Sequence, residues 1–147
     1  MKIPQYFLKI VLITIAFLLI FSDNRAQNNF NGIYKVSNSG KAFTLKSDTI
    51  VLHVDSIALL SINEFMTVKK KHDRKMNSYE LLITLTESGT KIFAEVSEAN
   101  IGKQLAVIID NKLLTAPFVN TIISEGKISV TGLEKETVNE IVKYFKN

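Results

Sequence analysis

The chain has 147 residues, no cysteine and a formal net charge of +4. After removal of an N-terminal leader this length fits one domain, and the absence of cysteine excludes disulfides and a lipid-anchored lipoprotein. Part of the positive charge belongs to the leader, and most of the rest lies in residues 69–75. The total charge therefore indicates neither a nucleic-acid-binding protein nor one with an acidic substrate.

The N-terminal residues predict export. Lys2 and Lys9 precede the apolar run Ile10–Phe21, which is shorter than the roughly 20 residues that a transmembrane helix needs. Polar residues follow the run, an order typical of a cleaved signal peptide over residues 1–26. The alternative is an uncleaved anchor over residues 6–22. We therefore expect an exported protein, periplasmic or secreted, or else one anchored in the inner membrane.

Residues 27–56 are expected to form a lead-in rich in Asn, Ser and Gly, which favour turns and bury little apolar surface. Within this lead-in, residues 33–36 predict one short strand, and the β-rich residues 50–54 predict a second strand at a sheet edge. A compact domain is expected to follow, over residues 57–147.

The compact domain begins with two predicted strands, residues 64–70 and 79–86, which are joined by a charged loop. A helix over residues 88–98, capped by Ser88, has one apolar stripe to bury. A helix stop signal follows at Asn100.

The C-terminal part alternates strands with turn residues. Leu105–Ile109 is continuously apolar, as expected of a central strand covered on both faces. Asp110-Asn111 predicts a two-residue turn, after which the return strand ends at Pro117 because proline cannot donate to a ladder. Residues 127–131 alternate as a half-buried strand, and residues 134–145 predict a helix with one apolar face.

The compact domain thus has the predicted order β-β-α-β-β-β-α. Short turns join strands that are adjacent in sequence, and each helix has one apolar face to cover. The sequence therefore predicts an α+β fold of two layers, in which the helices cover one face of a largely antiparallel sheet.

The segment F-A-E-V-S-E-A-N-I-G-K-Q-L-A-V-I-I-D-N-K-L-L-T-A-P, followed by G-K-I-S-V-T-G, resembles the head subdomain of the first periplasmic domain of SecD and SecDF. SecD and SecDF are accessory subunits of the bacterial protein-export translocon. The chain departs from the family pattern with Ser97 for threonine, Asn111 for glycine and Glu134 for a hydroxyl cap, and none of these changes breaks the fold. The residues that match the pattern are Phe93, Asn100, Gly102, Lys103, Asp110, Ala116, Pro117, Gly126 and Gly132.

The resemblance extends over residues 57–147 and implies a SecD head-like domain that engages emerging polypeptide. SecD-like proteins also carry several transmembrane helices and a transmembrane acidic residue for proton coupling. This sequence has one apolar segment, at its N-terminus. The resemblance therefore implies a freestanding exported copy of the head, which cannot itself use the proton gradient.

Five basic residues form the strongest charge feature, and these are Lys69, Lys70, Lys71, Arg74 and Lys75. They could hold anionic lipid headgroups or an acidic part of a partner, or they could form a solvated hairpin loop whose lysines protect a sheet edge. No aromatic residues alternate with them, so we do not expect nucleic-acid binding.

Two apolar features are further candidates for partner binding. The first is a sheet edge that could add an extended peptide by strand pairing, formed by Leu113, Leu114, Pro117 and Phe118. The second is an apolar groove beside the helices, lined by residues such as Phe93, Phe118 and Ile122. Both sets of side chains could instead belong to the core.

Nothing in the sequence indicates catalysis. His53, expected to be half-buried in a strand, and His72 lack metal-ligand spacing, the glutamates lie on predicted helix surfaces, and no nucleophile has a base nearby. We therefore expect a non-enzymatic exported binding module, without cofactor or metal, that contacts unfolded or extended polypeptides or translocon-related partners. The alternative is an envelope-associated adaptor that binds a partner or a membrane surface through residues 69–75.

Overall fold

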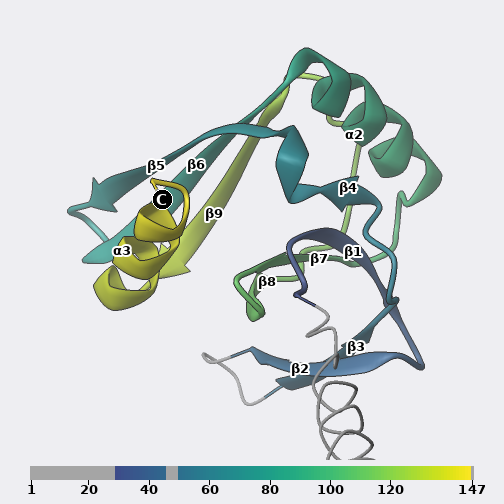
Figure 1. The fold of residues 1–147 in the computed structure, drawn as a ribbon, viewed down its shortest axis with the longest axis horizontal. Coiled ribbons are helices and arrows are strands. Elements are labelled where there is room, and N and C mark those ends of the chain that lie inside the picture. Colours follow the sequence, from purple (N-terminus) through teal and green to yellow (C-terminus); the bar gives the residue numbers. More distant parts are fainter. Residues whose placement is uncertain (1–28, 46–49, 147) are drawn as a thin grey trace, which may run out of the picture.

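The computed structural model describes residues 29–45 and 50–146, and the structural statements below concern these residues (Figure 1). Along the chain the elements are β1 (Gly32–Ser37), β2 (Lys41–Leu45), β3 (Ile50–Val54), β4 (Leu60–Ser61), the 3-10 helix η1 (Ile62–Glu64), β5 (Phe65–Asp73), β6 (Ser78–Leu85), α2 (Glu87–Ala99), β7 (Leu105–Ile109), β8 (Lys112–Thr115), β9 (Lys127–Leu133) and α3 (Lys135–Tyr144).

The strands form two sheets. The larger sheet has the order β2-β3-β1-β7-β8, with β4 added beside β1, and the smaller sheet has the order β5-β6-β9. All named strand pairs are antiparallel. Helix α3 packs on the smaller sheet, and α2 lies beside β4 and the end of β6 (Figure 1). The predicted α+β class with antiparallel pairing is confirmed, and its division between two sheets is an addition from the structure.

Strand β7 lies in the centre of the molecule and is buried on both faces, as its continuous apolar run predicted. Leu105, Val107 and Ile109 belong to the main core, whereas Ala106 and Ile108 belong to a smaller one on the opposite face. Side chains of a strand alternate between its two faces, which explains this division. The smaller core is completed by Phe30, Tyr34, Phe43, Val54 and Leu113.

The lead-in is more ordered than its composition predicted. Strand β1 pairs with β7 in the middle of the larger sheet, and Phe30 and Tyr34 are 4% exposed. Residues 50–54 form β3, but β3 pairs with both β2 and β1, so the predicted edge position is wrong and β2 takes it. Residues 38–40 form the bend between β1 and β2, while Phe30, Tyr34 and Phe43 fill the smaller core. A domain boundary at residue 57 stays a prediction.

Helix α2 begins one residue earlier than predicted, and its N-cap is Thr86 instead of Ser88. The Thr86 hydroxyl oxygen accepts a hydrogen bond from the Gly89 amide at 2.9 Å and also bonds the Glu64 carboxylate. An N-cap oxygen satisfies an amide that the first helical turn leaves unpaired, and Thr86 occupies the extended backbone position that a cap requires.

The two-residue turn between β7 and β8 is confirmed. Asp110 and Asn111 have φ angles of 51° and 57°, and such left-handed pairs are typical of two-residue hairpins. Helix α3 spans nearly the predicted range, with Val138 and Ile141 fully buried against the main core.

Candidate binding site

The basic segment lies on a strand for most of its length. The strand predicted for residues 64–70 continues to Asp73, so the predicted loop is wrong at residues 71–73. Strand β5 continues through Lys69, Lys70 and Lys71 to Asp73, and only residues 74–77 form the turn to β6. The long apolar stem of lysine can pack along an exposed strand while its ammonium stays in water. The charge of the segment therefore did not indicate a loop. The segment is therefore half of a β-hairpin.

Two of the lysines on β5 have partners within the protein. The Lys70 ammonium donates to the Asn139 side-chain oxygen on α3 at 2.8 Å. The Lys71 ammonium lies 3.4 Å from a carboxylate oxygen of Glu80, its cross-strand neighbour. A hydrogen bond from Ser129, and secondarily Lys71, lowers the pKa of the Glu80 carboxyl. Arg74 and Lys75 lie exposed in the turn.

The predicted sheet edge divides into buried and exposed parts. Leu113 and Leu114 on β8 are 7% and 6% exposed, and their side chains enter the smaller and the main core respectively. Pro117 and Phe118 are exposed, Phe118 by 61%. Because β8 ends the strand order of the larger sheet, its outer backbone edge has no ladder partner among the described strands.

A hollow of about 700 Å³ lies beside this edge, and we call it the edge hollow. Its walls are β2, β8 and the junction of β9 with α3, so the terminal strands of both sheets border one space. Lys112 of β8 bonds Glu140 of α3 at its rim. The residues that line it include Phe43, Leu45, Leu113, Thr115, Thr131 and Thr137.

A second hollow, of about 330 Å³, corresponds to the predicted apolar groove, and we call it the apolar hollow. The structure brings Phe93 and Phe118 together in its wall, but Ile123 takes the place expected for Ile122, which is exposed. The Ile123 amide donates to the buried Ser97 hydroxyl at 2.9 Å, which fixes the loop to α2.

The two hollows lie along one seam. The edge hollow is lined by residues 111–115 and by 131–134, while the apolar hollow is lined by residues 117–121 and by 127–129. Both hollows thus lie between β8 with its following loop on one side and β9 on the other. Strand β2, which forms a further wall of the edge hollow, was not predicted, although F-T-L within it alternates as a strand does.

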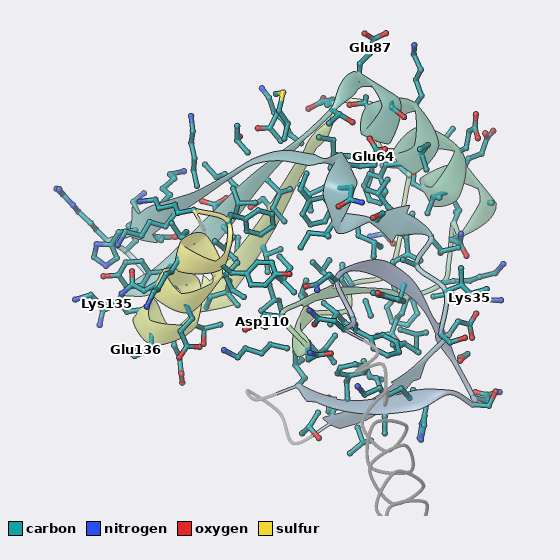
Figure 2. All side chains as sticks on the ribbon, in the orientation of Figure 1. Lys35, Glu64, Glu87, Asp110, Lys135 and Glu136 are labelled. Atoms are coloured by element: carbon teal, nitrogen blue, oxygen red, sulfur yellow. The ribbon has the colours of Figure 1, made fainter. Side chains whose placement is uncertain are left out.

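No described group of side chains has the composition of a metal centre. Within residues 29–45 and 50–146 no three His, Asp or Glu residues come together to hold a metal. The labelled charged residues in Figure 2 are spread over the molecule and do not converge. His53 is exposed, not half-buried as predicted, and His72 stacks on Tyr79 with ring centres 4.6 Å apart. In the same part of the chain, no helix is long and apolar enough to cross a membrane.

Comparisons with known proteins identify relatives. A family model described as the P1 head subdomain of SecDF matches residues 35–144. Protein translocase subunit SecD of Rhodothermus marinus is 32% identical over 85 residues, which cover 57% of this chain and 14% of that subunit. SecD of Rickettsia conorii is 48% identical over 54 residues, which cover 36% of this chain and 10% of that subunit.

Solved structures agree on the fold. A structure described as that of a membrane component SecDF that enhances protein export has a TM-score of 0.62 at 23% identity, covering 76% of this chain and 59% of that chain. A crystal structure of SecDF in a super-membrane-facing form has a TM-score of 0.60 at 23% identity, covering 78% of this chain and 18% of that chain. The chain spans a small part of the length of the SecD subunits, and the family model covers most of the chain. The chain belongs to the SecDF P1 head subdomain family.

Proposed function

We propose that this chain is a non-catalytic module of protein export that binds extended polypeptide segments in the edge hollow. Its family membership and the translocase subunits among its relatives support a role in export. The observation that carries the proposal is the arrangement of β2, β8 and β9, three terminal strands around a space of about 700 Å³. An extended peptide can add to such an edge by main-chain hydrogen bonds.

This mode of binding suits a protein that meets many different sequences. Terminal strands offer backbone N–H and C=O groups, which any peptide without proline can pair. The lining adds aromatic and aliphatic surface from Phe43 and Leu45 and hydroxyl groups from Thr115 and Thr131. The affinity would then depend on extended conformation and some apolar surface, and only weakly on a particular side chain.

The proposed location follows from the same family. We infer that the module acts on the exported side of the inner membrane, where it would meet a chain as it emerges. Its partners would be that polypeptide and translocon-related proteins. A module of this kind needs neither cofactor nor metal.

The test is peptide binding to the full chain, measured by fluorescence anisotropy with a labelled extended peptide of about six residues, close to a typical strand length. Thr44→Lys and Thr131→Lys each add a charged side chain to one wall of the edge hollow, and charged side chains on strand edges oppose pairing. We expect each variant to weaken binding about ten-fold or more. The loss of one or two main-chain hydrogen bonds costs about 1–2 kcal/mol, and about 1.4 kcal/mol corresponds to a ten-fold change in Kd.

The matched control is Thr121→Lys, which places the same side chain in the apolar hollow. We expect this control to bind the short peptide as the unaltered chain does. Circular dichroism and thermal melting check that all variants are folded. Equal binding by all variants, or no binding by a well-folded chain, would contradict the proposal.

A further inference from the structure

One face of the smaller sheet is covered and the other is open. Register pairs share a face, so Val68 of β5 lies on the same side as Ile83 of β6, toward the main core and α3. On the opposite side Lys69 is paired with Leu82, and Lys71 with Glu80. Lys69, Lys71 and Leu82 are all exposed, so no other described element covers this face.

The open face and the adjoining turn are basic. We define the basic face by four residues, Lys69, Lys71, Arg74 and Lys75, which are all exposed. Its two acidic neighbours are engaged locally, because Glu80 bonds Ser129 and Lys71. The Asp73 carboxylate accepts hydrogen bonds from the Lys75 and Met76 amides at 2.9 and 3.2 Å.

The tip of the hairpin carries an apolar side chain. Met76 is 76% exposed and follows Arg74 and Lys75 directly in the turn. Figure 1 shows that the hairpin ends away from the rest of the fold. Neither the edge hollow nor the apolar hollow is lined by any residue between 65 and 78. The hairpin is therefore a projecting surface, distinct from the seam between the sheets.

We propose that the basic face docks on an anionic lipid surface, with its cations on the headgroup phosphates and Met76 at the boundary with the acyl chains. The charges are complementary, since Lys and Arg are attracted to anionic leaflets over about a Debye length. A lipid surface accommodates a projecting tip, whereas an acidic peptide would be better held by a groove, which this face lacks. An exposed apolar residue beside cations is typical of interfacial binding.

The test uses the full chain with a single cysteine, Met76→Cys, labelled with an environment-sensitive fluorophore; the chain has no other cysteine to react. A second protein carries the same label at Glu95→Cys, on the exposed side of α2. Both are titrated with vesicles of phosphatidylglycerol mixed with phosphatidylcholine, and with vesicles of phosphatidylcholine alone. We expect a blue shift of the Met76→Cys probe only with the anionic vesicles, and none at Glu95→Cys.

Charge variants in the labelled protein then test the cations. Arg74→Gln with Lys75→Gln should weaken the vesicle response about thirty-fold, since each basic residue near an anionic surface contributes about a factor of five. Lys91→Gln with Lys103→Gln removes the same charge from the region of α2 and should change the response less than about two-fold. High salt should suppress the response.

Three outcomes would overturn the proposal. An equal shift on phosphatidylcholine alone would show that the tip needs no anionic charge. Equal losses in the two pairs of charge variants would show that only total charge matters. A shift with soluble polyglutamate but not with anionic vesicles would assign the face to an acidic polypeptide. The peptide-binding test of the edge hollow is independent of all three, because it concerns other residues.

Discussion

Ser97 offers a direct test of how the loop beside the apolar hollow is held. Its side chain is fully buried in α2, donates to the Ala94 carbonyl at 2.9 Å and accepts from the Ile123 amide at 2.9 Å. Ser97→Ala removes the acceptor and leaves the Ile123 amide without this partner. A buried donor without a partner costs about 1–3 kcal/mol. Because Ile123 is half-buried, water can partly replace the hydroxyl, and we expect a loss of about 1–2 kcal/mol.

The free energy of unfolding, measured in urea, gives the total effect, and amide hydrogen exchange at Ile123 locates it. A loss of this size should lower Tm by about 3–8 °C for a chain of this length. Ser97→Thr is the matched control, because it keeps the hydroxyl, and it should retain protection at Ile123. The reasoning is refuted if Ser97→Ala loses less than about 0.5 kcal/mol and its Ile123 amide still exchanges slowly.

Three further predictions concern the cap, a strained glycine and a buried phenol. Thr86→Ala should lower the free energy of unfolding by about 1 kcal/mol in urea, with Thr86→Ser close to the unaltered protein. Gly126 has φ +65°, and a Cβ there would lie 2.3 Å from the Thr90 hydroxyl oxygen. Gly126→Ala should therefore lower the free energy of unfolding by at least about 1 kcal/mol, measured by thermal melting. Thr90→Ala should restore only part of this loss, because the φ strain remains. Burial raises the pKa of the Tyr34 phenol above its ordinary value of 10.0, so its contribution to stability is complete below about pH 10 and falls as the pH rises toward the folded pKa. Tyr34→Phe should remove this decrease in the free energy of unfolding at high pH, measured by urea titrations from pH 8 to 11. Identical pH profiles for the two proteins would contradict the role of the Tyr34 phenol.

The sequence predicted the central elements well because their residues strongly favour one local structure. The run Leu105–Ile109 has no polar residue, so burial on both faces followed from the pattern alone. Asp110-Asn111 tolerates left-handed backbone, and the turn is in that conformation. The apolar face of α3 follows helical spacing, and Val138 and Ile141 are its buried members.

The remaining features depend on contacts between distant segments. Strand β5 continues beyond its predicted end at residue 70 because residues 71–73 pair with β6. Thr86 became the helix cap because η1 places Glu64 beside it. The division into two sheets likewise follows from β9 pairing with β6 and not with β8, a choice between strands of similar local character. The residue pattern within one segment does not determine such contacts with distant segments.

The seam between the sheets makes the proposed polypeptide site length-dependent. Strand β9 has 7 residues, and its six steps of about 3.3 Å cover about 20 Å from the apolar hollow at Lys127 to the edge hollow at Leu133. A peptide of about six residues can occupy the edge hollow alone, whereas one of about twelve can follow β9 into both.

We therefore expect Thr121→Lys, silent with the short peptide, to weaken binding of the long peptide several-fold in the same anisotropy assay. Thr131→Lys should weaken both peptides, because it lies in the wall that each must contact. If lengthening the peptide neither tightens binding nor makes it sensitive to Thr121→Lys, the two hollows are separate sites. The polypeptide would then contact the edge hollow alone, and the exposed Phe118 beside the apolar hollow would have no part in holding it.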